Sequence, residues 1–371
     1  MSSPSAWSRD EPRPVDRSFR TDAQAEPARP DGGAASGAAA TQPATRELTL
    51  SQAVNEALAE ELRRDPTVFV IGEDVAEAGT PFKVMSGLVE EFGPERIIDS
   101  PISEAGIAGI GLGAAMTGMR PVVDVMFGDF MTLVMDQLLN QAAKIHYMSG
   151  GRLNAPLTIR TTLGATRRSA AQHSQSLHAL VAHVPGVKVV LPATPYDAKG
   201  LFKSAIREDN PVVVFEDKMM FAVKGPVPDE EYVVPLGVAD VKREGDDLTI
   251  VATSSMVYVA LEAAEKLAAD GISAEVLDPR TLVPLDRETI VGSAAKTGRA
   301  IVVDEGHRSY GAGAELAALI AEEAFYELDA PVRRLCAMDV PIPFSPVLED
   351  LTVPTPDDVY TEGLTLVRGQ P

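Results

Sequence analysis

Cysteine is almost absent from the sequence, because Cys336 is the single cysteine among 371 residues. One thiol cannot form an intrachain disulfide, and it cannot supply a zinc or iron–sulfur site that needs several cysteines. Long hydrophobic runs are also lacking. The longest nearly uncharged stretch, residues 105–119, contains five glycines and is shorter than the ~20 apolar residues of a membrane-spanning helix. The sequence therefore predicts neither a disulfide-stabilised scaffold nor a membrane partner.

Basic residues are scarce relative to acidic ones. The chain has 33 Lys and Arg against 54 Asp and Glu, which gives a formal net charge of −21 at pH 7. Binding to nucleic acid needs clustered cations that contact phosphates, so we expect no nucleic-acid partner. Hydrophobic residues at 45% and charged residues at 23% are typical of soluble globular proteins, and at about 150 residues per domain the length suggests two domains.

Large apolar residues are nearly missing from residues 1–46, which contain six prolines. Such a segment cannot bury enough surface to offset the entropy lost on ordering, so we predict a disordered N-terminal tail. A transit peptide is rich in Arg and poor in acids, whereas this segment has six Arg and six Asp or Glu and no apolar centre of a signal peptide. We expect a cytoplasmic protein, and the Ala- and Arg-rich composition suggests a bacterial one.

From residue 47 onward, short apolar runs alternate with segments of helical periodicity. This alternation predicts an α/β fold with a doubly wound parallel sheet over residues 47–225. The expected strands cover residues 67–72, 96–99, 121–127, 155–160, 188–191 and 211–215, and the expected helices cover 48–64, 104–117, 130–148 and 198–207.

A second, smaller α/β domain is predicted over residues 247–371. An irregular, proline-containing segment at residues 226–246 interrupts the alternation and is interpreted as a linker. Strands are expected beyond it at residues 248–252, 273–277 and 300–303, with helices at 257–270 and 313–325.

Gly109, Gly111 and Gly113 match the spacing of the glycine fingerprint of dinucleotide binding. Those glycines must lie in the turn directly after a strand, whereas here they fall inside a helical pattern that begins near Glu104. We interpret the small residues as a surface for close packing against another helix or a neighbouring subunit, and not as an NAD site.

Residues 99–104 lead from a strand end to a helix start, which is where ligands collect in doubly wound sheets. Glu104 has two interpretations on its residue type. It is either a first-turn acid that the helix dipole favours by about 0.3–1 kcal/mol, or a catalytic carboxylate beside the apolar Ile102.

Three of the five histidines, His173, His178 and His183, recur every five residues. On a helix this spacing places neighbours about 140° apart, so they cannot form the i, i+4 pair of a zinc site. His173 lies in a polar cluster after the loop at residues 164–168. It is a candidate for acid–base work or substrate binding, with a solvated loop histidine as the alternative.

Seven segments together carry a family resemblance. They are Ile71-Gly-Glu-Asp-Val75, Arg96-Ile-Ile-Asp-Ser-Pro-Ile-Ser-Glu104, Tyr147-Met-Ser-Gly-Gly151, Gln172-His-Ser-Gln175, Pro185-Gly-Val-Lys-Val-Val190, Asp197-Ala-Lys-Gly200 and Leu328-Asp-Ala-Pro331. In this order, from about residue 47 to the C-terminus, the sequence resembles the β subunits of thiamine diphosphate-dependent 2-oxo acid dehydrogenases of the pyruvate and acetoin dehydrogenase type, in the transketolase-like superfamily.

The resemblance implies a pyrimidine-binding domain followed by a transketolase C-terminal domain. It further implies a heterotetramer of two α and two β subunits, with thiamine diphosphate at each α–β interface. In this family the α subunit carries a Gly-Asp-Gly motif that holds the diphosphate through Mg²⁺, and that motif is missing from this sequence. Further implied partners are a 2-oxo acid substrate and the dihydrolipoyl acyltransferase core with its lipoyl domain.

The resemblance also assigns roles to residues. Glu104 matches the glutamate that hydrogen-bonds a pyrimidine ring nitrogen and so favours the imino form of the cofactor's amine. Ile102, Met126 and Phe130 match residues that line the pyrimidine pocket, although by type alone Met126 and Phe130 would be ordinary core residues. His173 matches an active-site histidine that orients the substrate carboxylate or assists acyl transfer. A potassium ion is implied at the backbone carbonyls of Leu157, Ala205, Ile206, Glu208 and Asn210.

The expected activity is oxidative decarboxylation of a 2-oxo acid, foremost pyruvate, with transfer of the acyl group to a lipoyl domain. The alternatives are the β subunit of an acetoin dehydrogenase or a branched-chain 2-oxo acid dehydrogenase, and a non-catalytic scaffold for the acyltransferase core. The residues do not fix the substrate side chain, because its pocket would draw on both subunits.

Overall fold

The computed structural model describes residues 45–369, which belong to one compact unit. The predicted disordered tail lies outside the described residues except for its last two, Thr45 and Arg46. These two begin strand β1 (Thr45–Thr49), which pairs antiparallel with β8 (Lys224–Pro228). Composition could not reveal this end of the tail, because the pairing partner lies far along the chain.

The larger sheet has seven strands in the order β12-β6-β7-β5-β4-β2-β3, and the neighbours from β6 to β3 run parallel. The chain starts at β2, goes outward to β3 on one side and then to β4 on the other, so the winding direction reverses at β2. This is the predicted doubly wound sheet. Its strands are β2 (Val68–Gly72), β3 (Ile97–Asp99), β4 (Arg120–Val125), β5 (Thr158–Leu163), β6 (Lys188–Val190), β7 (Val212–Asp217) and β12 (Thr281–Val283).

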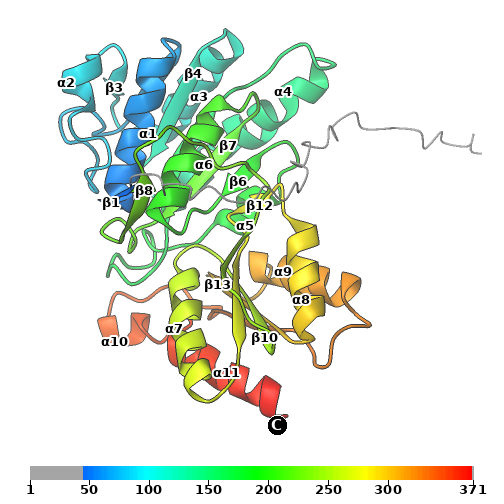
Figure 1. The fold of residues 1–371 in the computed structure, drawn as a ribbon. Coiled ribbons are helices and arrows are strands. Elements are labelled where there is room, and N and C mark those ends of the chain that lie inside the picture. Colours follow the sequence, from blue (N-terminus) through cyan, green and yellow to red (C-terminus); the bar gives the residue numbers. More distant parts are fainter. Residues whose placement is uncertain (1–44, 370–371) are drawn as a thin grey trace, which may run out of the picture. The chain divides into compact units, whose positions relative to one another are not determined.

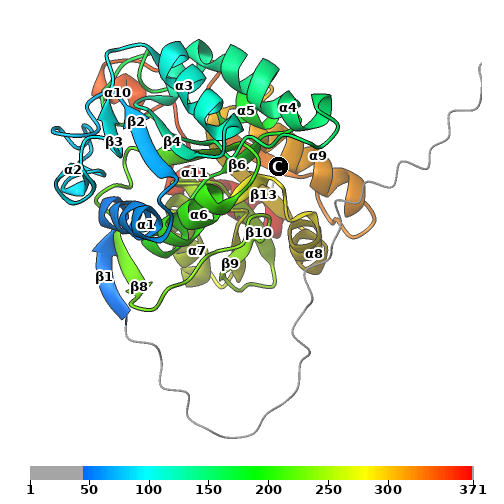
Figure 2. The same cartoon turned by 90° about the horizontal axis from the view of Figure 1, so that it is seen from above.

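Helices cover both faces of this sheet, with α3 (Glu104–Met116) and α4 (Ala143–Met148) on one face and α1 (Leu50–Arg64) and α6 (Pro195–Arg207) on the other (Figure 2). Alternate residues of the central strands face opposite cores. Val122 of β4 packs with α1 and α6, whereas Val123 packs with α3. Two short helices complete this part, α2 (Leu88–Phe92) and α5 (His178–Ala182).

The expected single helix over residues 130–148 is divided into three. A 3₁₀ helix, η1 (Gly128–Leu133), and a π-helix, η2 (Asp136–Ala142), precede α4. A Cβ atom on Gly128 would lie 2.3 Å from the carbonyl oxygen of Thr162 on β5. The chain therefore needs glycine where the segment starts, and such non-α turns are frequent at functional sites.

The smaller sheet, of which Figure 1 labels β10 and β13, has the order β14-β13-β10-β11-β9, with β9 antiparallel to β11 and the other neighbours parallel. Its strands are β9 (Asp240–Arg243), β10 (Leu248–Ala252), β11 (Ala274–Asp278), β13 (Ala300–His307) and β14 (Arg333–Ala337). Its helices are α7 (Met256–Ala269), α8 (Arg287–Thr297), α9 (Ala312–Glu323), α10 (Pro346–Glu349) and α11 (Pro356–Arg368). None of the helices between residues 45 and 369 is long and apolar enough to cross a membrane.

The segment predicted as an irregular linker, residues 226–246, contributes to two sheets through the end of β8 and through β9. In addition, β12 lies beyond this segment in sequence and pairs antiparallel with β6 of the larger sheet. Short edge strands of this kind carry a weak sequence pattern, because their pairing comes from distant partners and not from local periodicity.

Candidate active site

The loops that follow five neighbouring parallel strands meet at the carboxyl edge of the larger sheet. Glu73 follows β2, Glu104 begins α3 after β3, and Phe127 follows β4. The loop of residues 164–173 follows β5, and Lys218 follows β7. This edge, at the point where the winding reverses, is the usual ligand position in open α/β sheets.

Glu104 is the first residue of α3, directly after the N-cap residue Ser103, whose side chain makes no capping hydrogen bond. Its side chain is half-buried, and it has no hydrogen-bond or ion-pair partner in the described part of the chain. Burial raises the pKa of Glu73, and the nearby charges of Asp74 and Glu104 add to this rise. Glu73 therefore faces Glu104. We did not predict Glu73, although it directly follows a buried strand within Ile71-Gly-Glu-Asp-Val75.

The His173 ring lies between two phenylalanines. Its centroid is 4.7 Å from that of Phe127 and 5.4 Å from that of Phe130, both in edge-to-face geometry. The two phenylalanine rings also contact each other edge to face, with their centroids 5.7 Å apart. His173 is thus held against an aromatic wall and is not a freely solvated loop histidine. The prediction included Phe130 but missed Phe127, because its sequence position next to a strand suggests ordinary packing.

The backbone of the His173 segment is also fixed from two sides. Lys218 donates a hydrogen bond from Nζ to the carbonyl oxygen of His173. Asp129 Oδ1 accepts hydrogen bonds from the backbone nitrogen and from Nε2 of Gln175, at 3.2 and 2.9 Å. Lys218 could not be predicted as a site residue, because a lysine after a strand is usually solvated.

Ile102 and Met126, the other predicted pocket residues, differ in exposure. Met126 is half-buried, whereas the Ile102 side chain is 73% exposed. An exposed isoleucine two residues from an unpartnered carboxylate, with an aromatic wall at the same edge of the sheet, suits the flat, partly apolar pyrimidine end of thiamine diphosphate. The chain lacks a Gly-Asp-Gly motif to hold the diphosphate end through a metal ion. The residues present therefore fit one half of a thiamine site.

The five residues predicted to bind potassium lie near the end of α6 and at the starts of β5 and β7: Leu157, Ala205, Ile206, Glu208 and Asn210. Several of their carbonyl oxygens already accept hydrogen bonds within the chain. The oxygen of Leu157 accepts from the Val212 nitrogen at 3.0 Å, and that of Ala205 accepts from Thr158 Oγ1 at 3.1 Å.

Arg120 contacts two more of these carbonyls. Its Nη1 donates to the oxygens of Ile206 and Glu208, at 3.1 and 3.0 Å. The guanidinium thus brings a positive charge to the place where the cation was expected. Potassium binding at these carbonyl oxygens remains a prediction.

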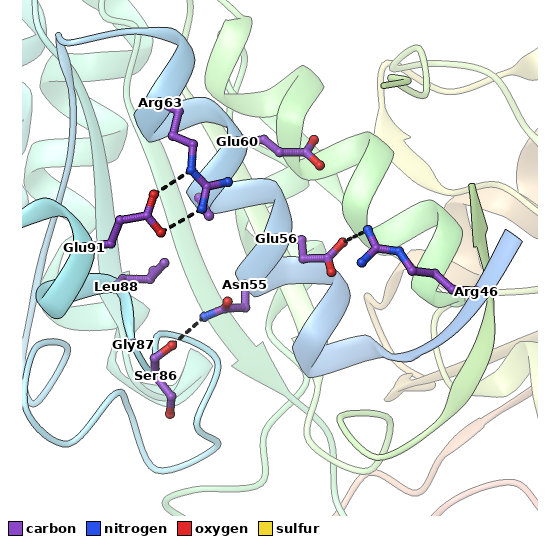
Figure 3. Close-up of a pocket in the computed structure, with 10 residues that line it drawn as sticks. Arg46, Asn55, Glu56, Glu60, Arg63, Ser86, Gly87, Leu88 and Glu91 are labelled. Atoms are coloured by element: carbon purple, nitrogen blue, oxygen red, sulfur yellow. Dashed lines mark hydrogen bonds and ion pairs between the residues drawn. The ribbon is translucent and has the colours of Figure 1, made fainter. Parts of the chain in front are cut away.

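A separate polar pocket lies between α1 and residues 86–91 (Figure 3). Arg63 and Glu91 form two hydrogen bonds across it, at 2.5 and 2.7 Å, and Asn55 donates to the carbonyl oxygen of Ser86 at 3.1 Å. The pocket contains none of the predicted site residues. Exposed ion pairs of this kind contribute about 0–1 kcal/mol each, and we assign this pocket no role in the site.

Two family models match the chain. Residues 46–223 match the transketolase pyrimidine-binding domain, and residues 237–359 match the transketolase C-terminal domain. A solved structure described as a split-gene transketolase, inactive β4 tetramer, superimposes with a TM-score of 0.72 at 26% sequence identity, covering 86% of this chain and 99% of that one. The fold is therefore of the transketolase type.

Three curated relatives are similar over most of their length. The acetoin:2,6-dichlorophenolindophenol oxidoreductase subunit beta of Bacillus subtilis is 48% identical, over 88% of this chain and 98% of the relative. The 2-oxoisovalerate dehydrogenase subunit beta of the same organism is 47% identical, over 84% and 96%. The mitochondrial pyruvate dehydrogenase E1 component subunit beta of Dictyostelium discoideum is 48% identical, over 83% and 87%.

A pyrimidine-binding domain followed by a transketolase C-terminal domain defines a protein of the thiamine-dependent transketolase class. Within that class, the chain belongs to the family of E1 β subunits of the pyruvate, acetoin and branched-chain dehydrogenase complexes. This confirms the family expected from the sequence motifs. The near-equal identities to relatives named for three different substrates do not distinguish among these substrates.

Proposed function

We propose that this chain is the β subunit of a pyruvate dehydrogenase E1 component, which decarboxylates the 2-oxo acid and transfers the acyl group to a lipoyl domain. The observation that carries this proposal is that the unpartnered Glu104 carboxylate, the exposed Ile102 and the aromatic wall around His173 all belong to segments at the sheet edge where the winding reverses. Pyruvate is the leading substrate because several relatives are named for it. Action in the cytoplasm of a bacterium is part of the proposal.

Thiamine diphosphate, when bound, supplies the electron sink for cleaving the bond between the carbonyl carbon and the carboxylate of a 2-oxo acid. Glu104 would hold a proton at the pyrimidine ring nitrogen, while Ile102 and Met126 would line the ring. Phe127 and Phe130 pack edge to face on the His173 ring and shield part of it from water, which would strengthen its electrostatic interaction with a substrate carboxylate. An imidazole at this position can donate to that carboxylate or move a proton during acyl transfer.

The α subunit is proposed to supply the diphosphate-binding site and its Mg²⁺. The two kinds of subunit would form a heterotetramer of two α and two β subunits that delivers acyl groups to the acyltransferase core. We predict that this chain alone binds thiamine diphosphate poorly, because it holds only the pyrimidine half of the site. Isothermal titration calorimetry with Mg²⁺ present, with and without the partner, measures this. Equally tight binding by the isolated chain would contradict the split site.

Replacement of His173 is expected to reduce acylation of a lipoyl domain. His173→Ala removes the titrating group, and loss of a positioned proton donor costs typically about 10²-fold or more. Rates with an artificial electron acceptor and with a lipoyl domain, measured on the reconstituted enzyme, separate decarboxylation from acyl transfer. The matched control is His183→Ala, an exposed histidine just after α5. Unchanged rates on both acceptors in His173→Ala would reduce His173 to a bystander.

Substrate assays test the function itself. The chain is combined with an α subunit that carries the Gly-Asp-Gly motif, and pyruvate, branched-chain 2-oxo acids and acetoin are compared by kcat/KM. The value of kcat/KM is expected to be highest for pyruvate. Preference for acetoin or a branched-chain acid would assign the chain to one of the alternative members of the family. An assembled complex without turnover on any of them would favour the non-catalytic scaffold.

A further inference from the structure

Two buried carboxyl groups meet beneath the loop that carries His173. Asp217 ends β7 of the larger sheet and is 1% exposed, whereas Glu305 lies in β13 of the smaller sheet and is 7% exposed. The backbone nitrogen of Ala165, at the start of the loop, donates to Glu305 Oε1 at 2.6 Å. The neighbouring nitrogen, that of Thr166, donates to Glu349 Oε1 at 2.7 Å. Carboxylates from the C-terminal part of the chain thus hold two consecutive amides of the loop.

The two carboxyl groups approach the same point beside Gly164. A Cβ atom on Gly164 would lie 2.9 Å from Asp217 Oδ2 and 3.1 Å from Glu305 Oε2. Asp217 Oδ2 is buried and has no hydrogen-bond donor among the described residues, and the Asp217 carboxyl group is a principal influence on the protonation of Glu305. Two ionised carboxylates cannot donate to each other, so a single shared proton satisfies both oxygens.

The charged groups around the pair do not replace that proton. Lys218 is a cation near the pair and also interacts with the charges of Asp129 and Glu349, but its Nζ donates to the carbonyl oxygen of His173. Arg168 pairs with Glu349 at 2.7 Å and with Asp350 at 2.6 Å.

Ser255 Oγ donates to Glu305 Oε2 at 3.3 Å from the start of α7. Beside Glu305 in β13, Asp304 is engaged by His178, with its Oδ1 3.0 Å from His178 Nε2. Burial, and then the charge and hydrogen bond of Asp217, raise the pKa of Glu305 well above the ordinary carboxyl range. The protonated pair is therefore the state that this packing favours.

We propose that Glu305 is a positioning residue, which holds the His173 loop in its working geometry through one proton shared with Asp217. Two contacts connect the pair to the His173 loop. Glu305 of β13 accepts from the backbone of Ala165, and Lys218, next to Asp217 at the end of β7, donates to the carbonyl oxygen of His173. The proposal rests on the proposed function, because Glu305 acts through His173.

The sign of the pH dependence follows from protonation in the folded state. A carboxyl group whose folded pKa is raised contributes fully to stability below its unfolded pKa, and this contribution is lost as pH rises through the folded pKa. Above the folded pKa, the buried carboxylates of Asp217 and Glu305 repel each other. The start of the loop, at residues 164–166, is then held less firmly. Turnover of the intact enzyme is expected to fall on its alkaline side for this reason.

The test compares pH profiles of kcat for the reconstituted enzyme and two Glu305 variants. Glu305→Gln keeps an acceptor for Ala165 and adds a permanent donor for Asp217, so its alkaline limb is expected to shift upward or disappear. Glu305→Ala removes both and is expected to lose about 10- to 100-fold in kcat at neutral pH through misplacement of the loop. The matched control is Glu275→Gln, a 1% exposed carboxylate in β11 that pairs with Lys296.

The alkaline limb of the control is expected to match that of the unaltered enzyme. An alkaline limb that stays in place in Glu305→Gln would overturn the proposal and point to another group, such as Lys218. Full turnover by Glu305→Ala would overturn it as well.

A second measurement needs no activity. The thermal midpoint of the full chain is recorded between neutral and alkaline pH for the unaltered sequence, Glu305→Gln and Asp217→Asn. The thermal midpoint of the unaltered chain should fall as the pH rises, and the midpoints of both variants should fall less. Identical slopes in all three would overturn the shared proton, whatever substrate the enzyme uses. A smaller dependence of the midpoint on pH in the variants supports the shared proton even if the enzyme turns over none of the substrates. The proposal for Glu305 and the proposed function can therefore fail independently.

Discussion

Glu104→Gln is expected to reduce turnover of the reconstituted enzyme by about 10²- to 10⁴-fold while the complex still assembles. The amide has nearly the shape of the carboxylate but cannot hold an ionisable proton at the pyrimidine nitrogen. Glu104 is half-buried and free of hydrogen bonds and ion pairs within the described residues, so no fold contact depends on its charge. Steady-state rates and size-exclusion chromatography of the complex, measured on the same preparation, give the two readouts.

Glu315→Gln is the matched control for this prediction. Both glutamates lie in the first turn of a helix, Glu104 in α3 and Glu315 in α9, so both lose the same helix-dipole contribution of about 0.3–1 kcal/mol. Turnover should fall in Glu104→Gln alone. Equal, small effects of the two substitutions would show that Glu104 is an ordinary helix-start acid, which is the alternative that its residue type allows.

Arg160→Met is expected to destabilise the chain by about 3–5 kcal/mol, because it leaves buried carboxylates without their counter-ion. Arg160 is 1% exposed, and its guanidinium binds Asp124 and Glu216, with Nη2 2.6 Å from Glu216 Oε2. Burial raises the pKa of both carboxyl groups even beside the arginine. Burial opposes the charge of Arg160, but the two carboxylates outweigh it and raise the pKa of the guanidinium.

Urea unfolding of the full chain measures this loss, with Arg63→Met as the control. Arg63 also makes two hydrogen bonds to a carboxylate, that of Glu91, but on the surface (Figure 3). Exposed pairs of this kind contribute about 0–1 kcal/mol. The loss in Arg160→Met should grow as pH rises, because its carboxyl groups would have to ionise without a cation. A loss no larger than that of the control would mean that the buried cluster relaxes or admits water.

Much of the larger sheet follows from local sequence. The run Val-Phe-Val-Ile-Gly of β2 is buried throughout and β-branched in part, so it can hardly form anything but a central parallel strand. Glu104 and His173 are also predicted from sequence as candidate site residues, because each belongs to a motif that carries the family resemblance. Local pattern could not give the strand of Thr45 and Arg46, the crossing of β12 to the larger sheet, or the division of residues 128–148 into three helical types. Each of these depends on partners far along the chain.

The amino-acid sequence by itself determined the family, the alternation of strands and helices and the lack of a motif for the diphosphate, and it predicted half of a thiamine site at Glu104, Ile102, Met126, Phe130 and His173. Tertiary structure decided what surrounds those residues. Phe127 reaches the His173 ring, Lys218 holds its carbonyl, and Glu305, more than a hundred residues away in sequence, holds the loop at Ala165. Local periodicity records whether a residue is buried, whereas the partner that a buried charge meets is set by how distant strands are brought together.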